Sequence, residues 1–174
     1  MRIALAFNLR EESVPADDSA AAEPPSAPPL SPADDLYAEW DDIHTIRAVE
    51  SALASRHEVT LVEAGLDAFV AFRDLRPDLV FNMAEGLRGA SREAQLPSLL
   101  DMLGVPYTGS DPVTLGICLD KSRTKEILSY HRIPTPRFSV VANLTELPSR
   151  LHYPLMVKPT LEGSSKGVCR QRRT

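Results

Sequence analysis

The residues best suited to chemistry lie between Val157 and Val168. This run reads Val-Lys-Pro-Thr-Leu-Glu-Gly-Ser-Ser-Lys-Gly-Val, so a lysine stands on each side of a loop of glycines and serines. Glycine lets backbone N–H groups approach an anion closely, serine adds hydroxyl donors, and lysine adds positive charge. This chemistry suits a polyphosphate, although the residue order is not that of a Walker A loop. An ordinary polar turn between strands is the alternative for this stretch taken alone.

Composition and charge narrow the classes of partner. The 174 residues are 43% hydrophobic and carry a formal net charge of −5, which suits a packed core and disfavours nucleic acid as a partner. No apolar run of about 18 residues is present, so we expect no membrane-spanning helix. Cys118 and Cys169 lack metal-site spacing, which favours a reducing cytoplasm as the location. Cys118 falls in an apolar helical stretch and is expected to be a small buried core residue.

Hydrophobic periodicity alternates between strand and helix through the first two thirds of the chain. An apolar run at 78–83 is typical of a strand buried on both faces. Short connections between such elements predict an α/β fold with an open, largely parallel, Rossmann-like sheet and helices on both faces. Ligands lie beyond the carboxyl ends of such strands, so the loops at 8–13, 82–92 and 109–112 should share one rim. The expected strands are 1–8, 58–62, 78–83 and 105–108, and the expected helices are 35–55, 66–75 and 91–103.

Two further regions have a different character. Residues 13–35 are rich in proline, alanine and acidic side chains, which predicts a mobile insertion, an inert surface loop being favoured over a regulatory docking segment. Residues 1–111 are expected to form a first domain, and 112–174 the beginning of an incomplete α+β domain. The elements expected there are helices at 112–130 and 145–151 and strands at 138–141 and 154–158.

Five blocks of sequence, taken together, resemble the ATP-grasp superfamily and most closely the D-alanine–D-alanine ligase family. Five blocks in the family's order are more specific than any single one. The resemblance covers about 78–168, and residues 1–77 match only by pattern. The blocks are Val80-Phe81-Asn82, Leu103 to Ser110, Asp120-Lys121 with Thr124-Lys125, Ile133 to Pro136, and Pro154 to Val168.

The resemblance implies an ATP-dependent carboxylate–amine ligase that forms a dipeptide for the peptidoglycan of the cell wall. In this family an N-terminal domain binds the first amino acid, whose carboxylate takes the γ-phosphate of ATP to become an acyl phosphate. The second amino acid then displaces phosphate through its amine. Such chemistry is mainly positioning and charge neutralisation. ATP, Mg²⁺, a small amino acid and a homodimer are the cofactors and partners that the resemblance implies.

Six positions of this chain match the family's phosphate site. Five match residues that contact or close over the phosphates, and one matches a position beside the loop. Lys121 and Lys158 match its two phosphate-contacting lysines. Gly163, Ser164 and Ser165 match the loop that closes over the phosphates. Glu162 matches a position beside that loop.

Other positions depart from the family's pattern. The family's loop after the first strand carries a glycine- and serine-rich run with a glutamate that pairs with the substrate ammonium. That run is absent here, and Glu11 or Glu12 could serve in place of this glutamate. Glu85 stands where the family has a histidine, and an acidic group there would attract an ammonium and repel a carboxylate, so the amino acid stays open. Arg88 and Arg92 could bind a carboxylate or be exposed residues at a helix start, and exposure is favoured.

The run after Val168 is basic where the family continues an apolar strand. The family's metal ligands lie beyond this point, so no metal ligands are expected in this chain. A truncated or frameshifted reading explains the run most simply, and a fragment without ligase turnover of its own is expected. The alternatives are a noncatalytic amino-acid-binding or regulatory module, and an ATP-grasp ligase for another amino acid or for peptides.

Overall fold

The computed structural model describes residues 1–10, 39–143, 154–164 and 166. The predicted insertion at 13–35 and the predicted helix at 145–151 lie outside these residues. Three parallel strands form one sheet in the order β2-β1-β3. They are β1 (Arg2–Phe7), β2 (Glu58–Glu63) and β3 (Leu79–Asn82). The predicted strand at 105–108 is reduced to one parallel bridge between Val80 and Tyr107 beside β3.

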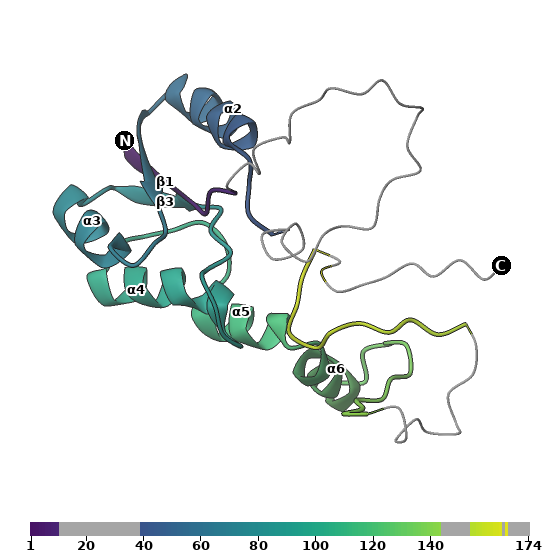
Figure 1. Cartoon of the computed structure of the whole chain (residues 1–174). Helices are drawn as coiled ribbons and strands as arrows, with labels where there is room; N and C mark the ends of the chain where they lie inside the picture. The colour runs from purple at the N-terminus through teal and green to yellow at the C-terminus, as the bar shows by residue number, and fades with distance from the viewer. Residues whose placement is uncertain (11–38, 144–153, 165, 167–174) are drawn as a thin grey trace, which may run out of the picture.

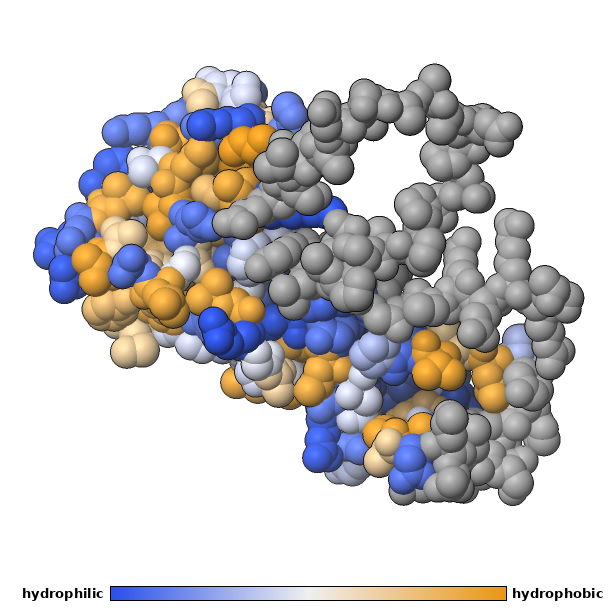
Figure 2. All heavy atoms as spheres, in the orientation of Figure 1, coloured by the Kyte–Doolittle hydropathy of each residue, from blue (hydrophilic) through white to orange (hydrophobic). Residues whose placement is uncertain are grey.

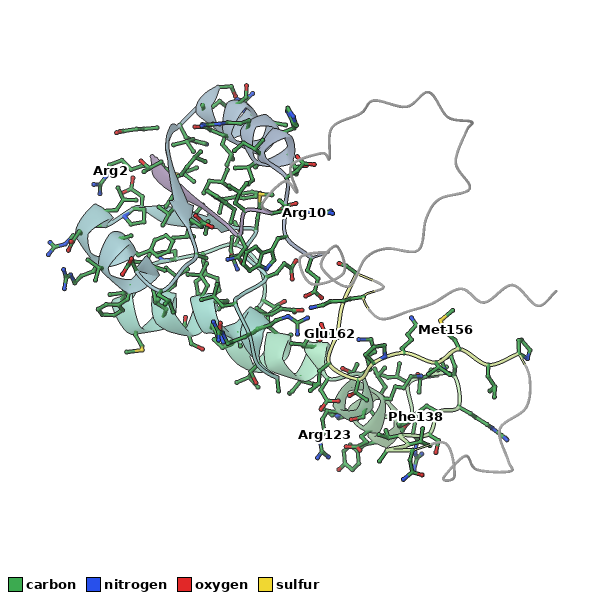
Figure 3. The ribbon with its side chains drawn as sticks, in the orientation of Figure 1. Arg2, Arg10, Arg123, Phe138, Met156 and Glu162 are labelled. Carbon is green, nitrogen blue, oxygen red and sulfur yellow. The ribbon has the colours of Figure 1, made fainter. Side chains whose placement is uncertain are left out.

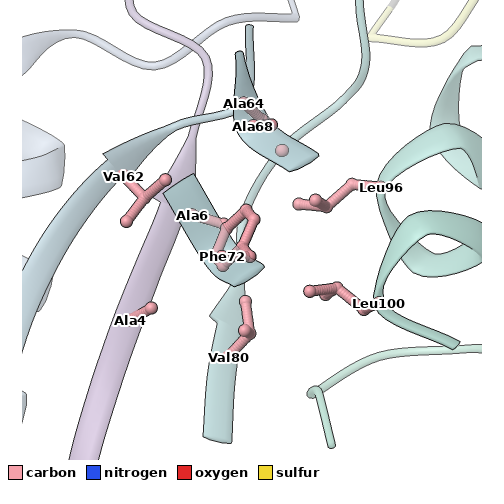
Figure 4. Close-up of a cluster of buried hydrophobic side chains, with 10 residues drawn as sticks. Ala4, Ala6, Val62, Ala64, Ala68, Phe72, Val80, Leu96 and Leu100 are labelled. Carbon is pink, nitrogen blue, oxygen red and sulfur yellow. The ribbon is translucent and has the colours of Figure 1, made fainter. Parts of the chain in front are cut away.

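Helices cover both faces of the sheet, which confirms the predicted α/β architecture. Successive side chains of a strand point to opposite faces, and in β1 Leu5 and Phe7 face α2 (Ile43–Ala54) through the buried Ile46. Ala4 and Ala6 face the opposite side, where α3 (Ala68–Leu75) and α4 (Gln95–Leu103) pack. Figure 1 shows this sheet with α2 on one side and α3 and α4 on the other. Figure 4 shows this second cluster, in which Phe72, Leu96 and Leu100 fill the space above the small alanines. Within β3 only Val80 is fully buried, so burial on both faces holds for one residue of the predicted run.

Local capping explains where the helices begin and end. α2 begins at Ile43 rather than near 35, because the Asp42 carboxylate accepts a hydrogen bond from the Thr45 N–H and acts as its N-cap. α4 follows a 3₁₀ turn, η1 (Arg92–Ala94), and ends at Gly104, whose φ of 66° is the left-handed cap that glycine favours.

The helix predicted at 112–130 is two helices. α5 (Pro112–Leu119) and α6 (Lys121–Tyr130) are separated at Asp120, whose backbone is extended and whose carboxylate caps α6 by accepting from the Ser122 and Arg123 N–H groups. Aspartate at such a position favours a new helix start over continuation. Cys118, near the end of α5, is exposed, so its predicted place in the core is wrong.

The region after α6 differs from the predicted beginning of an α+β domain. Neither 138–141 nor 154–158 is a strand, so both strand predictions are wrong for these residues. Apolar side chains lie on the surface here, with Val140, Met156 and Val157 at 57%, 73% and 83% exposure. Figure 2 shows such apolar patches beside polar ones at this end of the molecule. A strand needs a neighbouring strand to pair its backbone groups, and no strand lies beside these segments among the described residues. No helix within the described ranges is long and apolar enough to cross a membrane.

Candidate phosphate-binding site

The first turn of α6 contacts the glycine loop at 158–166. Asp120 begins the helix, so Lys121 occupies its first position. The Lys121 backbone N–H donates to the Thr160 carbonyl at 3.0 Å, and its ammonium donates to the Glu162 carbonyl. Figure 3 shows Glu162 where this C-terminal segment passes the adjoining ends of α5 and α6. A helix start and a loop about 40 residues apart in sequence are thereby fixed against each other.

A pocket of about 120 Å³ opens between these two segments. Its charged side chains are three lysines and one glutamate, a balance that favours an anion. Ser164 has a φ of 45°, a left-handed conformation that serine rarely adopts and that costs on the order of 1 kcal/mol or more. Such backbone outliers are frequent at ligand sites. The pocket is lined by Lys121, Lys158, Pro159, Glu162, Gly163, Ser164 and Lys166.

The structure thus brings together five of the six phosphate-site residues predicted from the sequence. Lys121, Lys158, Glu162, Gly163 and Ser164 line one pocket, whereas Ser165 lies outside the described residues. Their binding of phosphate stays a prediction. Glu11 and Glu12, predicted for the substrate ammonium, also lie outside the described residues.

A buried ion pair joins the glycine loop to the sheet domain. Arg92 and Glu39 have side chains only 9% and 6% exposed, and an Arg92 Nη2 to Glu39 Oε2 distance of 2.6 Å. Arg92 also donates from Nη1 to the Leu161 carbonyl at 2.7 Å, and the Gly163 N–H donates to Glu39 Oε1 at 2.6 Å. We call this contact the Glu39–Arg92 clasp. A Cβ at residue 163 would meet Glu39 Oε1 at 2.5 Å, so any other residue there would displace the end of the Glu39 side chain.

The clasp overturns the prediction that Arg92 is exposed, whereas Arg88 is exposed as predicted. A guanidinium is almost never fully buried without a paired carboxylate. Sequence reasoning missed Glu39, because it belongs to no motif and its partner Gly163 is 124 positions away. The polar run Ser91-Arg92-Glu93 was the local sequence signal that pointed to Arg92.

A second set of contacts organises the carboxyl edge of the sheet. The buried Asn8 side chain follows β1, accepts from the Glu85 and Gly86 N–H groups at 3.0 Å each, and donates to the Ala64 carbonyl at 3.2 Å. One amide therefore ties together the loops after all three strands. Gly86 is required here, since its φ is 81° and a Cβ would meet the Arg92 carbonyl oxygen at 2.1 Å.

Glu85 is held at this rim with an altered acidity. The pKa of its carboxyl is raised to about 7, chiefly by burial and then by the nearby carboxylates of Glu93 and Glu39, against the lowering effect of Arg92. The pKa of Glu93 is raised as well, chiefly by burial. Near neutral pH, Glu85 can therefore either accept a hydrogen bond as a carboxylate or donate one as an acid.

Curated proteins with similar sequences are D-alanine–D-alanine ligases. The ligase of Bordetella pertussis is 38% identical over 124 residues, which is 64% of this chain and 38% of that protein. The ligase of Pseudomonas entomophila is 32% identical over 125 residues, or 70% of this chain and 39% of that protein. An uncharacterized protein of Sinorhizobium fredii, y4sG, is 42% identical over 90 residues and is covered to 27% of its length. This chain thus spans well under half of the relatives it matches. No family model matches the chain.

Solved structures of similar fold are D-alanine–D-alanine ligases of Bacillus anthracis. One of them, complexed with ATP, aligns with a TM-score of 0.61 at 22% identity over 92% of this chain and 48% of that one. Another aligns with a TM-score of 0.64 at 24% identity over 97% of this chain and 48% of that one. The fold therefore places this chain in the α/β class to which those ligases belong.

Sequence similarity and fold together define the kind of protein. The chain is D-alanine–D-alanine ligase-like, as the five sequence blocks predicted. Its ligase family resemblance is confirmed, and its own activity is a separate question.

Proposed function

We propose that this chain carries the amino-acid-binding domain and the phosphate-binding loop of an ATP-dependent carboxylate–amine ligase of the D-alanine–D-alanine ligase type. The observation that supports it best is the pocket in which Lys121 and Lys158 converge on Gly163 and Ser164. In this proposal the amino-acid-binding domain ends at residue 111 and the phosphate-binding part begins at residue 112. The protein would act in the cytoplasm, in peptidoglycan synthesis, and as the homodimer that the family resemblance implies.

The pocket residues would hold the triphosphate of ATP. Lysine ammonium groups neutralise phosphate charge, and the Ser164 hydroxyl can donate to a phosphate oxygen. When bound, ATP would supply the phosphoryl group that converts the first amino acid into an acyl phosphate. This chain would hold that triphosphate and would bind the amino acid at the rim where Asn8 and Glu85 lie.

Across the described residues, no group of three or more His, Cys, Asp or Glu side chains is arranged to hold a metal ion. The Mg²⁺ that the family resemblance implies would take its protein ligands from outside these residues.

The rim supports an amino acid as the second ligand. Glu85 in its ionised form would pair with a substrate ammonium, because opposite charges in a partly buried site attract strongly. In its protonated form it would donate to a carboxylate oxygen. A small amino acid thus fits the rim, and another amino acid or a peptide is kept as an alternative substrate for the same ligase chemistry.

Binding by the full chain of 174 residues tests the proposal. We expect saturable ATP binding by calorimetry, weakened about a hundredfold or more by Lys121→Met combined with Lys158→Met, since each charged hydrogen bond lost costs about 1.5–3 kcal/mol. Arg123→Met is the control, because Arg123 lies on the same helix, is 67% exposed and pairs with Glu126 outside the pocket. A wild-type chain that does not bind ATP, or a double variant that binds like the wild type, would refute the proposed site.

Turnover is a separate outcome. We expect no phosphate release from this chain alone when ATP, Mg²⁺ and D-alanine are added, since it spans under two fifths of the length of the curated ligases. Release would show that the chain is competent by itself.

A noncatalytic amino-acid-binding module is the second candidate function. It is favoured by one observation: both hydrophobic clusters lie between β1 and residue 107, and none of their members comes from α6 or the glycine loop. A module of this kind predicts a melting temperature that rises with an amino acid and not with ATP. The ligase proposal predicts a rise with each of them.

A further inference from the structure

Lys166 lines the same pocket as Lys121 and Lys158, the two lysines predicted to contact phosphate. Its side chain is only 18% exposed, and its Nζ lies 3.2 Å from Glu162 Oε2. Its backbone N–H donates to the Gly163 carbonyl at 2.8 Å, which closes a tight turn. That turn folds the Lys166 side chain back into the pocket, which it lines with Ser164.

The contact with Glu162 leaves the Lys166 ammonium able to bind a ligand. Glu162 Oε2 also lies 3.3 Å from Arg92 Nη2, a cation that it shares with Glu39, so part of its charge is compensated without Lys166. The same oxygen is buried but has no hydrogen bond of good geometry to either cation. An ammonium has three donors, and an ion pair in this geometry does not engage them fully.

The three lysines enter the pocket from three different places. Lys121 is fixed at the start of α6, Lys158 begins the glycine loop, and Lys166 ends it. Opposing cations on several sides of a cavity suit a ligand with several charged oxygens better than a single carboxylate.

We propose that Lys166 is a third polyphosphate-binding cation of this pocket, held inside it by the Glu162 carboxylate when no polyphosphate is bound. The proposal rests on the proposed phosphate site and assigns it one more contact. Binding would transfer the Lys166 ammonium from Glu162 to a phosphate oxygen, while Arg92 continues to compensate Glu162.

Inorganic tripolyphosphate is the probe that tests this proposal, because it presents the phosphates without the nucleoside. With the full chain, we expect Lys166→Met to weaken binding about fivefold to tenfold, the range for one charge-assisted contact in a partly solvated site. It should also lessen the loss of affinity with added salt, because one fewer charge pair is screened. Lys166→Arg should stay within about threefold of the wild type because it keeps the charge. Arg123→Met should leave binding unchanged.

Glu162→Gln separates this role from a merely structural one. If Lys166 binds phosphate, removing its carboxylate partner should tighten tripolyphosphate binding, because the ammonium no longer has to leave an ion pair. If Lys166 only supports the loop through Glu162, the Glu162→Gln and Lys166→Met variants should weaken binding alike, which would overturn the proposal. Circular dichroism of each variant checks that it is folded.

The remaining outcomes are also decisive. Wild-type binding that Lys166→Met leaves unchanged would remove Lys166 from the site and leave Lys121 and Lys158 in place. Absence of tripolyphosphate binding by the wild-type chain would overturn the phosphate site as a whole, and Lys166 with it.

Discussion

The sheet region, meaning the described residues before Lys121, and the region from Lys121 onward differ greatly in how tightly their side chains pack. In the first, α3 places Phe72 against alanines of β1, and the ring is 0% exposed. In the second, no described residue is buried, and α6 contributes none to either hydrophobic cluster. The two regions have helices of similar length, so the difference lies in what the helices rest on.

Short-range polar contacts stabilise α6 in place of a core. The Asp120 cap, the Arg123–Glu126 pair and the Lys125 ammonium, which donates to Thr135 and to the Pro136 carbonyl, are its main contacts. Exposed ion pairs and caps contribute about 1 kcal/mol each or less, whereas a buried aromatic ring contributes several times that. The candidate phosphate site thus belongs to the weakly packed region and is joined to the strongly packed one by the Glu39–Arg92 clasp.

The largest expected effect comes from cutting the core of the sheet region. Phe72→Ala should lower the free energy of unfolding by about 3–5 kcal/mol, because it leaves a cavity between β1 and α4. The matched change in the other region is Phe138→Ala, which removes a half-buried ring beside the Lys125 ammonium and should cost about 1 kcal/mol or less. Urea denaturation followed by circular dichroism measures both. Equal losses would show that the second region has a core comparable to the first.

Breaking the clasp should have the next largest effect. Arg92→Met leaves the nearly buried Glu39 carboxylate without its cation and removes the donor to the Leu161 carbonyl, which should cost about 3 kcal/mol. Urea denaturation measures the loss. Limited proteolysis with chymotrypsin reports on the loop, and cleavage near Leu161 should become faster once the clasp is gone.

Arg73→Met is the control for the clasp. Arg73 is 53% exposed and pairs with its neighbour Asp74, so its loss should change stability by less than about 0.5 kcal/mol and leave the cleavage pattern unchanged. If Arg92→Met behaves like Arg73→Met in both assays, the loop is attached to the sheet region by some other contact.

Most of the sheet region followed from sequence pattern, because its elements depend on local periodicity and on a buried face. The strands near 1–8, 58–62 and 78–83, their parallel pairing and the helices on both faces are as predicted, whereas 105–108 contributes only one bridge. The break at Asp120 was missed, since neither glycine nor proline marks it and the polar run after it also fits an exposed helix face. The strands predicted at 138–141 and 154–158 failed for a different reason: a strand depends on a partner, which local pattern does not reveal.

The candidate site was predictable in part. The family resemblance predicted that Lys121 and a loop about 40 residues later share one site. The structure brings both to one pocket. The burial of Arg92 and the role of Glu39 could not be predicted, because a buried charge depends on a partner that only the fold supplies.

The smallest expected effect concerns Glu85, whose acidity reports on how closed the rim between the two regions is. Its carboxyl pKa is raised to about 7 by burial and by Glu93 and Glu39, so the folded state prefers the protonated form. The stability that this preference provides is complete below about pH 4.3, the ordinary pKa of glutamate in unfolded chains, and is lost as pH rises to about 7. Glu85→Gln removes this loss. The variant should match the wild type near pH 4 and exceed it by about 1 kcal/mol at pH 8, after discounting for partial exposure.

Urea denaturation from pH 4 to pH 8 measures this difference in unfolding free energy. Asp74→Asn is the control, because hydrogen bonding to Arg73 lowers the pKa of Asp74, so its replacement should gain no stability as pH rises. Arg92→Met sharpens the comparison. Arg92 lowers the Glu85 pKa, so loss of its charge alone should raise that pKa, whereas entry of water into the rim should lower it. A smaller gain from Glu85→Gln at pH 8 in the Arg92→Met background would show that the clasp keeps water from the rim, and a larger gain would show that the rim stays closed without it. A gain that is independent of pH would mean that Glu85 is not desolvated at the rim.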